Sequence, residues 1–361
     1  MSGVWGNKVK FSIFGESHGN AIGITIDGLE SGIELDMEEI NREMRRRAPG
    51  RNKISTPRNE KDEFEILSGY FNNRTTGTPL CAIIRNSNQH SKDYEKIKNI
   101  MRPAHADYTG NIRYKGFNDY RGGGHFSGRI TAPIVFAGAI AKQILRLKGV
   151  VIGSHIKSIG EIEEDYFDSI NIKEELLKDL SHKEFAVIND ETGERMQEEI
   201  LKAKEEKDSL GGIVECAVLN LPSGIGSPFF YSIESVLSHI LFSIPAVKGV
   251  EFGAGFNISK MKGSDANDEI YIEEGKIKTY TNNNGGILGG ISNSMPLIFR
   301  AAFKPTPSIG RPQKTVNIET KENTTVEIEG RHDPCIVQRA VPVVEAVAAM
   351  GILDLVYIQN I

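Results

Sequence analysis

The chain has 361 residues and carries 43 basic against 48 acidic side chains, a net charge of −5. Apolar residues make up 39% and charged residues 25%, a composition typical of soluble globular proteins. The sequence has no run of 18 uninterrupted apolar residues and no signal-peptide pattern at its N-terminus, and Cys81, Cys216 and Cys335 lie too far apart for a disulfide framework. We therefore expect a cytoplasmic protein without a membrane span.

The first part of the chain alternates in the manner of β-strands around one helix. Asp36, followed by Glu39, forms a capping box that opens a helix through about Arg47, before Pro49-Gly50 ends it. Alternation of apolar and polar residues predicts strands at 7–14, 20–28, 64–71 and 80–86. Residues 87–128 are polar and glycine-rich, and we expect mostly loop there.

The middle of the chain contains the most apolar predicted helix. Residues 130–147 are apolar nearly all round in their first three turns, which indicates a helix buried on more than one side. A strand is predicted at 150–159. Residues 160–208 carry 17 acidic and 7 basic side chains, so we expect an acidic, surface-exposed insert with two polar helices, the second near 195–207.

The C-terminal part completes the fold prediction. A strand is expected at 212–221 and a helix at 232–243. Asp333 as N-cap and Pro334 at the first helical position predict a helix to about Met350, which Pro342 should kink or restart. Without a regular alternation of strand and helix, we predict one α+β domain spanning residues 1–361, with apolar helices in the middle and sheets outside.

Basic side chains concentrate between Arg42 and Arg58, where seven Lys or Arg accompany one acidic residue, Glu43. A solvated helix end with favourably placed cations explains such a run most simply. An anion site for phosphates or carboxylates is the sharper interpretation. Because the whole chain is acidic and no nucleic-acid motif accompanies the run, we do not expect nucleic-acid binding.

Several familiar motifs fail on their context or spacing. Gly15-Glu16-Ser17-His18-Gly19 matches the nucleophile elbow of serine hydrolases, but that motif requires a following helix and the next residues favour a strand. The dinucleotide fingerprint is absent, because the Gly122-Gly123-Gly124 run has the wrong spacing. The P-loop pattern G-x-x-x-x-G-K-[ST] does not occur either. No His/Cys pattern has zinc-site spacing, so no metal site is predicted.

Glycine-rich and proline-rich loops with cations and histidines are the remaining functional signal. Such loops allow a ligand to approach the backbone and its N–H groups closely. They are found at 15–19, 102–110, 120–129, 282–292, 303–312 and 330–342. Together they predict one site for a large anionic ligand, in which His18 and His105 have the right chemistry for proton transfer.

These loops carry a resemblance to a known family. GESHGNAIGITIDG near the start, RPAHADYTG, YRGGG, AVKGVEFG, GGILGGIS, KPTPSI and GRHDPCIVQRAVPVVEA occur in the order and spacing of chorismate synthase. The resemblance covers nearly the whole chain. It implies a carbon–oxygen lyase acting on phosphates, which removes the 3-phosphate and a C6 hydrogen from 5-enolpyruvylshikimate 3-phosphate to give chorismate. This is the last step of the shikimate pathway, which leads to the aromatic amino acids.

The resemblance also implies reduced FMN as cofactor, a β-α-β sandwich of central helices between antiparallel sheets, and a homotetramer. By resemblance, His18 protonates the departing phosphate, His105 protonates the reduced flavin, and Asp333 deprotonates C6 with help from Ser17. The resemblance assigns the binding of substrate or nucleotide anions to Arg47, Lys53, Arg129 and Arg339. It assigns the binding of the flavin to His125, Phe126, Ser127, Ala246, Gly289, Lys304, Pro305, Thr306, Pro307, Ser308 and Arg331.

The chain departs from the commoner family pattern at several of these positions. Where many members have Arg-Ser-Ser, this chain has His125, Phe126 and Ser127, and Pro245 replaces an asparagine. Lys53 replaces an arginine, so a bidentate contact becomes a point charge. If His125 supplies a charge, ligand phosphate should bind more weakly above pH 7, whereas an affinity that is flat from pH 6 to 8 would refute this.

Alternatives to the lyase remain open at this stage. The altered 125–127 triplet is compatible with a flavin carrier that has lost the lyase step, and Ser17 with a serine hydrolase. Some members of the family reduce their own flavin with NADPH (hence NADP as a second nucleotide), whereas others depend on an external reductase. The compact length of this chain favours an external flavin reductase as its partner.

Overall fold

The computed structural model describes residues 3–50, 54–55, 62–86, 98–328 and 332–360. Its main strands form two antiparallel five-stranded sheets, ordered β1-β2-β3-β7-β4 and β11-β16-β10-β8-β9. The first sheet comprises β1 (Val4–Trp5), β2 (Lys10–Gly15), β3 (Ala21–Asp27), β7 (Leu80–Arg85) and β4 (Phe64–Ser68). The second comprises β11 (Val247–Phe252), β16 (Leu297–Phe303), β10 (Gly212–Leu219), β8 (Val151–Ile159) and β9 (Ile162–Glu163).

Short two-stranded hairpins project from this frame. They are β5 (Tyr70–Phe71) with β6 (Arg74–Thr75), β12 (Ile270–Glu273) with β13 (Lys276–Thr279), β14 (Ile287–Leu288) with β15 (Ile291–Ser292), and β17 (Gln313–Asn317) with β18 (Glu322–Val326). The helices are α1 (Met37–Arg47), α3 (Asp107–Arg113), α4 (Thr131–Leu147), α5 (Glu174–His182), α6 (Asp190–Glu205), α7 (Ile233–Leu241), α8 (Gly263–Ala266) and α9 (Val337–Gln359). Short 3₁₀ helices cover Arg121–Phe126, Gly128–Ile130 and Gly255–Lys260.

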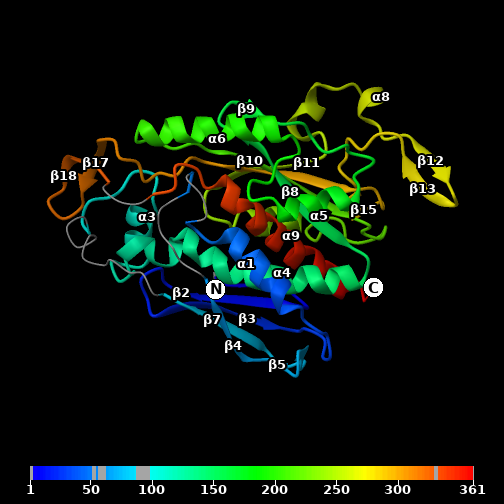
Figure 1. The fold of residues 1–361 in the computed structure, drawn as a ribbon, viewed down its shortest axis with the longest axis horizontal. Coiled ribbons are helices and arrows are strands. Elements are labelled where there is room, and N and C mark those ends of the chain that lie inside the picture. Colours follow the sequence, from blue (N-terminus) through cyan, green and yellow to red (C-terminus); the bar gives the residue numbers. More distant parts are fainter. Residues whose placement is uncertain (1–2, 51–53, 56–61, 87–97, 329–331, 361) are drawn as a thin grey trace.

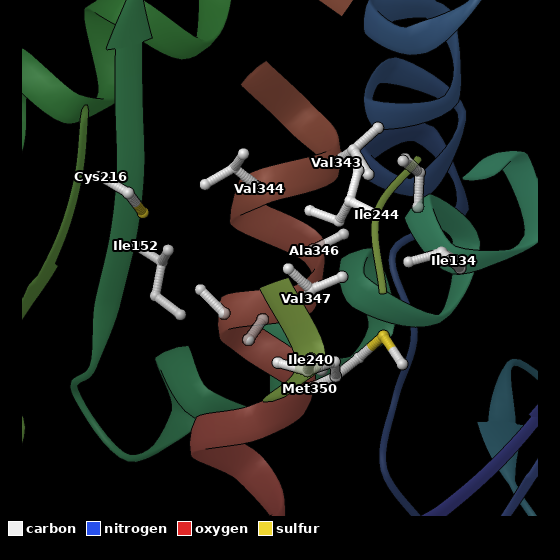
Figure 2. Close-up of a cluster of buried hydrophobic side chains, with 14 of the residues drawn as sticks. Ile134, Ile152, Cys216, Ile240, Ile244, Val343, Val344, Ala346, Val347 and Met350 are labelled. Atoms are coloured by element: carbon white, nitrogen blue, oxygen red, sulfur yellow. The ribbon is translucent and has the colours of Figure 1, made fainter. Parts of the chain in front are cut away.

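Helices α4 and α9 lie between the two sheets, and α5 and α6 lie outside the second sheet (Figure 1). The two central helices approach closely at Gly138, where a Cβ would lie 2.2 Å from that of Ala346. Figure 2 shows apolar side chains of α4, α7, α9, β8 and β10 converging on one cluster that includes Ile152 and Val347. The arrangement is α+β, as the sequence predicts.

The length and apolar character of α4 and α9 would suffice to cross a membrane. The span Gly128–Leu147 has 83% of its most apolar window buried inside the fold, and Val337–Gln359 has 89%. Buried helices of this kind form the core of a protein, where each face packs against another element.

A cluster of ionic side chains is buried between α1, α4 and α9, and we call Glu43, Arg46, Lys142 and Glu345 the core ion cluster. Arg46 makes a bidentate contact with Glu345 through Nη1 and Nη2 at 2.7 and 2.9 Å. Lys142 Nζ donates to the same carboxylate at 2.7 Å, and Arg46 also donates to Glu43 at 2.8 Å. Burial alone would raise the pKa of Glu345, but Arg46 and Lys142 hold that pKa well below its usual range.

The acidic insert has an exposed outer face and a buried inner one. Leu177, Leu180, Met196 and Ile200 are buried on its inner side. Its Glu164 accepts a hydrogen bond from His155 Nδ1 of β8 at 2.8 Å, while Glu215 accepts one from Nε2 at 3.0 Å. Burial alone would lower the pKa of His155, but the two carboxylates more than offset it and raise that pKa, so an imidazolium joins insert and sheet.

Most predicted elements occur, with shifted ends. The helix opened by Asp36 is confirmed, since the Asp36 carboxylate accepts from the Glu38 and Glu39 amides. The prediction that Asp333 is the N-cap of the last helix is wrong. Helix α9 begins at Val337 with Ile336 as N-cap, because the Asp333 carboxylate accepts a hydrogen bond from Arg339 instead. The same helix continues to Gln359 with Pro342 inside it, well beyond the predicted end.

Other differences come from signals that the pattern did not resolve. Helix α6 begins at Asp190, earlier than predicted, because the Asn189 side chain caps it through the Thr192 amide. Helix α3 lies within residues 98–128, where loop was expected. Strands β11 and β16 were not predicted, although they form one side of the second sheet.

Candidate active site

A cavity of about 1110 Å³ opens where the predicted loops meet. Residues from five of the six glycine-rich loops line it, including Ser17, His105, His125, Ser308 and Asp333. The sixth loop, 282–292, contributes no lining residue among those the structure describes. Five of the six predicted loops therefore meet at one cavity.

The described wall of the cavity is strongly cationic. Seven Lys and Arg side chains line it against three carboxylates, those of Asp107, Asp119 and Asp333. The seven are Arg47, Lys98, Arg102, Arg129, Lys248, Lys304 and Arg339. A hollow with this excess of cations attracts ligands that carry several negative charges.

Three of these cations form what we call the arginine cluster: Arg47, Arg129 and Arg339, with the carboxylates of Asp62 and Asp333. Arg47 Nη1 donates to Asp62 Oδ2 at 2.5 Å, and Arg129 Nη1 donates to Asp62 Oδ1 at 2.7 Å. Arg339 donates from Nη1 to Asp333 and from Nε to the backbone oxygen of Arg47 at 3.0 Å. The cluster carries three positive and two negative charges, so it has a net charge of +1.

Burial affects the charges of this cluster. Burial lowers the pKa of Arg47, Asp62 raises it, and the nearby Arg339 and Arg129 lower it further. Burial alone would raise the pKa of Asp62, but the two guanidinium groups hold it below its usual value. Asp62 therefore remains a carboxylate at neutral pH.

Ser17 and His18 occupy the turn between β2 and β3, and both are buried. The Ser17 amide donates to Gly124 O at 3.1 Å, which joins the turn to the glycine run. A Cβ at Gly122 would lie 2.1 Å from His18 Nδ1 and 2.9 Å from Ser17 Oγ, and Gly122 has φ +60°, so only glycine fits there. Ser17 and Gly122 line the cavity, whereas His18 lies directly behind Gly122.

This turn lacks the geometry of a serine hydrolase. A strand follows Ser17, whereas the nucleophile elbow needs a strand followed by a helix. The nearest elements are β2, β3 and the glycine run of Arg121–Phe126. The structure therefore disfavours the hydrolase alternative.

The surroundings of His105 favour the neutral form of its ring. Its Nδ1 lies 3.0 Å from the carbonyl oxygen of Pro103, and its Nε2 lies 2.8 Å from Ser308 Oγ. Burial, together with the neighbouring Arg102, lowers the pKa of His105 to about 4. In the neutral ring Nδ1 must carry the hydrogen, because a carbonyl oxygen only accepts; Nε2 then accepts from the Ser308 hydroxyl.

The residues assigned to a flavin divide into three groups. Lining the cavity are His125, Phe126, Ser127, Ala246, Lys304, Thr306, Pro307 and Ser308. Pro305 and Gly289 are not among the lining residues, and Gly289 lies in the turn of the β14–β15 hairpin. Arg331 lies outside the described residues, as does Lys53, which is assigned to substrate or nucleotide anions.

Three lining residues in this group have distinctive surroundings. His125 Nδ1 lies 2.8 Å from Gly15 O, so the ring donates to the backbone of β2. Phe126 is 41% exposed and packs near Tyr114, with ring centroids 6.1 Å apart. The Lys304 ammonium donates to Ala104 O at 2.6 Å, and burial lowers the pKa of Lys304, as does the nearby Lys248.

Sequence reasoning missed several residues that organise this cavity. Asp62 lies before β4 in a polar run with no recognisable motif, and Asn86 simply follows a strand. The Asn86 amide donates to Glu16 O and Gly19 O at 3.0 and 2.9 Å, and its carbonyl accepts from Arg129 Nε at 2.6 Å. Only the pairing of distant segments reveals these roles. The described residues include no group of three or more His, Cys, Asp or Glu side chains arranged to hold a metal.

Fold and cavity together define a class: an α+β protein with a large cationic cavity that contains histidines and a carboxylate suited to proton transfer. The family model described as chorismate synthase matches residues 9–357. The chain is 48% identical to the chorismate synthase of Thermococcus kodakarensis over 97% of this chain and 96% of that one. It is 47% identical to that of Methanocaldococcus jannaschii, over 98% and 96%.

A crystal structure of a chorismate synthase superposes with a TM-score of 0.78 at 31% identity, covering 98% of this chain and 93% of that chain. The chain belongs to the chorismate synthase family, the carbon–oxygen lyases of the shikimate pathway.

Proposed function

We propose that this cavity is the active site at which 5-enolpyruvylshikimate 3-phosphate loses its 3-phosphate and a C6 hydrogen to give chorismate, with reduced FMN as cofactor. The observation that carries the proposal is the meeting of Ser17, His105 and Asp333 with the arginine cluster around one cavity. His18 adjoins the same wall behind Gly122. These groups combine proton donors, a carboxylate base and anion-binding cations.

The cavity fits two anionic ligands. Its volume of about 1110 Å³ exceeds that of many single-ligand pockets. Substrate and FMN together bring two phosphates and the carboxylates of the substrate, and seven described cations face them. When bound, reduced FMN supplies an electron transiently and takes part in removing the C6 hydrogen.

The flavin would be held by the lining residues 125–127, by Ala246, and by Lys304 with 306–308. Ala246 has φ +76°, so its backbone is fixed in an unusual conformation at the wall. Its carbonyl accepts from the Lys304 amide at 3.0 Å, which joins two of these segments. Gly289, Pro305 and Arg331 remain predicted flavin contacts, and Lys53 remains a predicted substrate or nucleotide contact.

The two histidines have different surroundings and different assigned roles. His18, buried beside Ser17, is assigned to protonate the departing phosphate oxygen. His105 has a pKa of about 4, so its Nε2 has no proton to give at neutral pH until an anion enters the cavity. A negative charge close to Nε2 would raise the pKa of His105 and allow the ring to donate.

The carboxylate assigned to proton removal is held by a guanidinium. Arg339 donates a hydrogen bond to Asp333, which holds the carboxylate in place at the cavity wall. Arg339 itself is held by Arg47 O, so Asp333 is joined to the arginine cluster. Arg47, Arg129 and Arg339 would bind the substrate's phosphate and carboxylates near this base.

We further propose that the chain forms a single domain with the β-α-β sandwich of its family, acts in the cytoplasm, and assembles as a homotetramer. Exposed apolar side chains support association, since Phe229, Phe230 and Phe256 are each more than 80% exposed. We also propose that an external reductase supplies the reduced flavin. Light scattering on the purified protein will give the number of subunits.

The test is chorismate formation under anaerobic conditions with purified protein, 5-enolpyruvylshikimate 3-phosphate and dithionite-reduced FMN. Wild-type protein should form chorismate, and His105→Asn should lower kcat by about 100-fold or more. His182→Asn on the exposed insert is the matched control and should retain wild-type activity. Folded protein that binds FMN and forms no chorismate would contradict the proposal and favour a flavin carrier.

The same assay addresses the source of electrons. With oxidised FMN and NADPH in place of dithionite, we expect no chorismate until a separate flavin reductase is added. Chorismate formed with NADPH alone would show that the protein reduces its own flavin, and would overturn the proposed dependence on an external reductase.

A further inference from the structure

Asp62 is a buried carboxylate that binds two cavity arginines at once. It is only 4% exposed. One of its oxygens accepts from Arg47 and the other from Arg129, at 2.5 and 2.7 Å. Both arginines line the cavity, whereas Asp62 is not among its described lining residues. The carboxylate therefore stands behind the wall and contacts the ligand space only through the two guanidinium groups.

The backbone at Asp62 is held in an uncommon conformation. Its φ of +51° lies in the left-handed region, which a residue other than glycine adopts only at a free-energy cost. The position comes two residues before β4, so the first sheet fixes the chain directly after it. The backbone adopts this costly conformation at the residue whose carboxylate binds two arginines. This indicates that the position of the carboxylate matters to the site.

The remaining contacts of the two arginines are also fixed. Arg47 Nε donates to Thr131 Oγ1 and Nη2 to Gly128 O, each at 3.2 Å, at the start of α4. Arg129 Nε donates to Asn86, whose amide holds the turn of Ser17 and His18. Asp62 is the one described group that contacts both guanidinium groups, so it sets their spacing.

Electrostatics makes such a group necessary. Arg47, Arg129 and Arg339 are close enough that the last two lower the pKa of the first. Without a carboxylate between them, Arg47 and Arg129 would repel one another in a site shielded from water. Removing the Asp62 charge would raise the net charge of the arginine cluster from +1 to +2 and would remove the acceptor that Arg47 Nη1 and Arg129 Nη1 share.

We propose that Asp62 is a positioning residue that holds Arg47 and Arg129 as a paired clamp for one anionic group of the substrate. The inference rests on the proposed function, because it takes the shikimate phosphate ester as the ligand. It assigns a role to a side chain that touches no ligand itself. Positioning and charge have opposite consequences here: extra positive charge alone would tighten anion binding, whereas loss of position weakens it.

The experiment compares Asp62→Asn and Asp62→Glu with wild-type protein. The Kd for 5-enolpyruvylshikimate 3-phosphate is measured by calorimetry without flavin, and kcat and KM in the anaerobic assay. We expect Asp62→Asn to raise Kd and KM about tenfold or more while kcat changes less, since a displaced binding group can cost up to about 100-fold. Asp62→Glu keeps the negative charge between the two arginines and should still raise Kd severalfold because the carboxylate moves.

A double-mutant cycle shows whether Asp62 acts through its partner. In an Arg129→Gln background, Asp62→Asn should raise Kd by a clearly smaller factor than in wild-type protein. Glu65→Gln is the matched control, because Glu65 is an exposed carboxylate of β4 that pairs with Arg85 outside the cavity. It should leave Kd and KM unchanged.

The outcomes separate this inference from the proposed function. A Kd that stays within twofold of wild type in both Asp62 variants, or that falls, would overturn the clamp, as would independent effects in the cycle. Wild-type protein that binds the substrate and forms no chorismate would contradict the proposed function, while the Kd values would still decide the role of Asp62. Wild-type protein without measurable substrate binding would overturn both.

Discussion

Two buried clusters of ionic side chains begin at neighbouring residues of α1 and are built for different purposes. Arg46 points into the core ion cluster and Arg47 into the arginine cluster, and α9 supplies Glu345 to the first and Arg339 to the second. The core ion cluster has two positive and two negative side chains and is neutral. The arginine cluster has a net charge of +1.

The difference in net charge matches the surroundings of each cluster. In the core ion cluster, Arg46 and Lys142 each contact both carboxylates, and Glu345 also accepts from the Ser154 amide and hydroxyl at 3.2 and 2.9 Å. The arginine cluster lies at a cavity wall and keeps one positive charge that an anionic ligand can neutralise. Neutral clusters support the fold, whereas an excess of one charge prepares a site for a ligand.

The largest effect on stability is expected from Glu345→Gln in the core ion cluster. The change leaves Glu43 as the one carboxylate partner of the buried Arg46 and Lys142 among the described residues. Breaking a buried ion pair from one side typically costs about 3–5 kcal/mol. The free energy of unfolding from urea titrations should fall by that amount, whereas Glu65→Gln at the surface should leave it nearly unchanged.

The counterpart in the cavity is Arg339→Gln, which should act on ligand affinity instead. A hydrogen bond to a charged group contributes about 1.5–3 kcal/mol, so the Kd for 5-enolpyruvylshikimate 3-phosphate should rise about tenfold or more. The free energy of unfolding should fall far less than in Glu345→Gln, since the Arg339 side chain is partly exposed. Equal losses of stability in the two variants would contradict the division of roles.

Acid should affect the core ion cluster in a defined pH range. The pKa of Glu345 is held far below its ordinary value of 4.5, so its contribution to stability is complete above that pH and is lost as the pH falls. The free energy of unfolding should therefore decline below about pH 4.5. Glu345→Gln should show a shallower decline, and identical slopes would contradict this account of the cluster.

Salt should produce the smallest effect and act mainly on the cavity. At about 0.1 M salt the Debye length is about 10 Å, so salt weakens the long-range attraction between the cationic cavity and an incoming anion more than it weakens buried ion pairs. Raising sodium chloride from about 0.05 to 0.2 M should increase the substrate Kd several-fold and change the free energy of unfolding little. A Kd independent of salt would argue against binding by the arginine cluster.

The sequence predicts local features of this molecule well. Asp36 at the start of α1 and the apolar helix α4 follow from capping and periodicity, which depend on neighbouring residues. The loops that line the cavity were recognised by composition. Helix α3 was missed because its segment is polar and contains Gly110, so its pattern resembles a loop.

Features that depend on distant segments could not be predicted in the same way. Asp62 meets Arg129 across 67 positions, and Arg46 meets Glu345 across 299. The Asp333-Pro334 pair has the pattern of a helix start, but the cation of Arg339 takes the carboxylate away from the helix amides. Side-chain partners of this kind are decided by tertiary packing rather than by local propensity.

The most direct test of the central claim compares Arg46→Lys with Arg47→Lys, two neighbouring changes that keep the charge and lose the planar guanidinium. We predict that Arg46→Lys lowers the free energy of unfolding and leaves the KM for 5-enolpyruvylshikimate 3-phosphate within about twofold, because Arg46 does not line the cavity. Arg47→Lys should raise that KM about tenfold, with a smaller loss of stability. If both changes lower stability alike and neither alters KM, the two clusters do not have the separate roles described here.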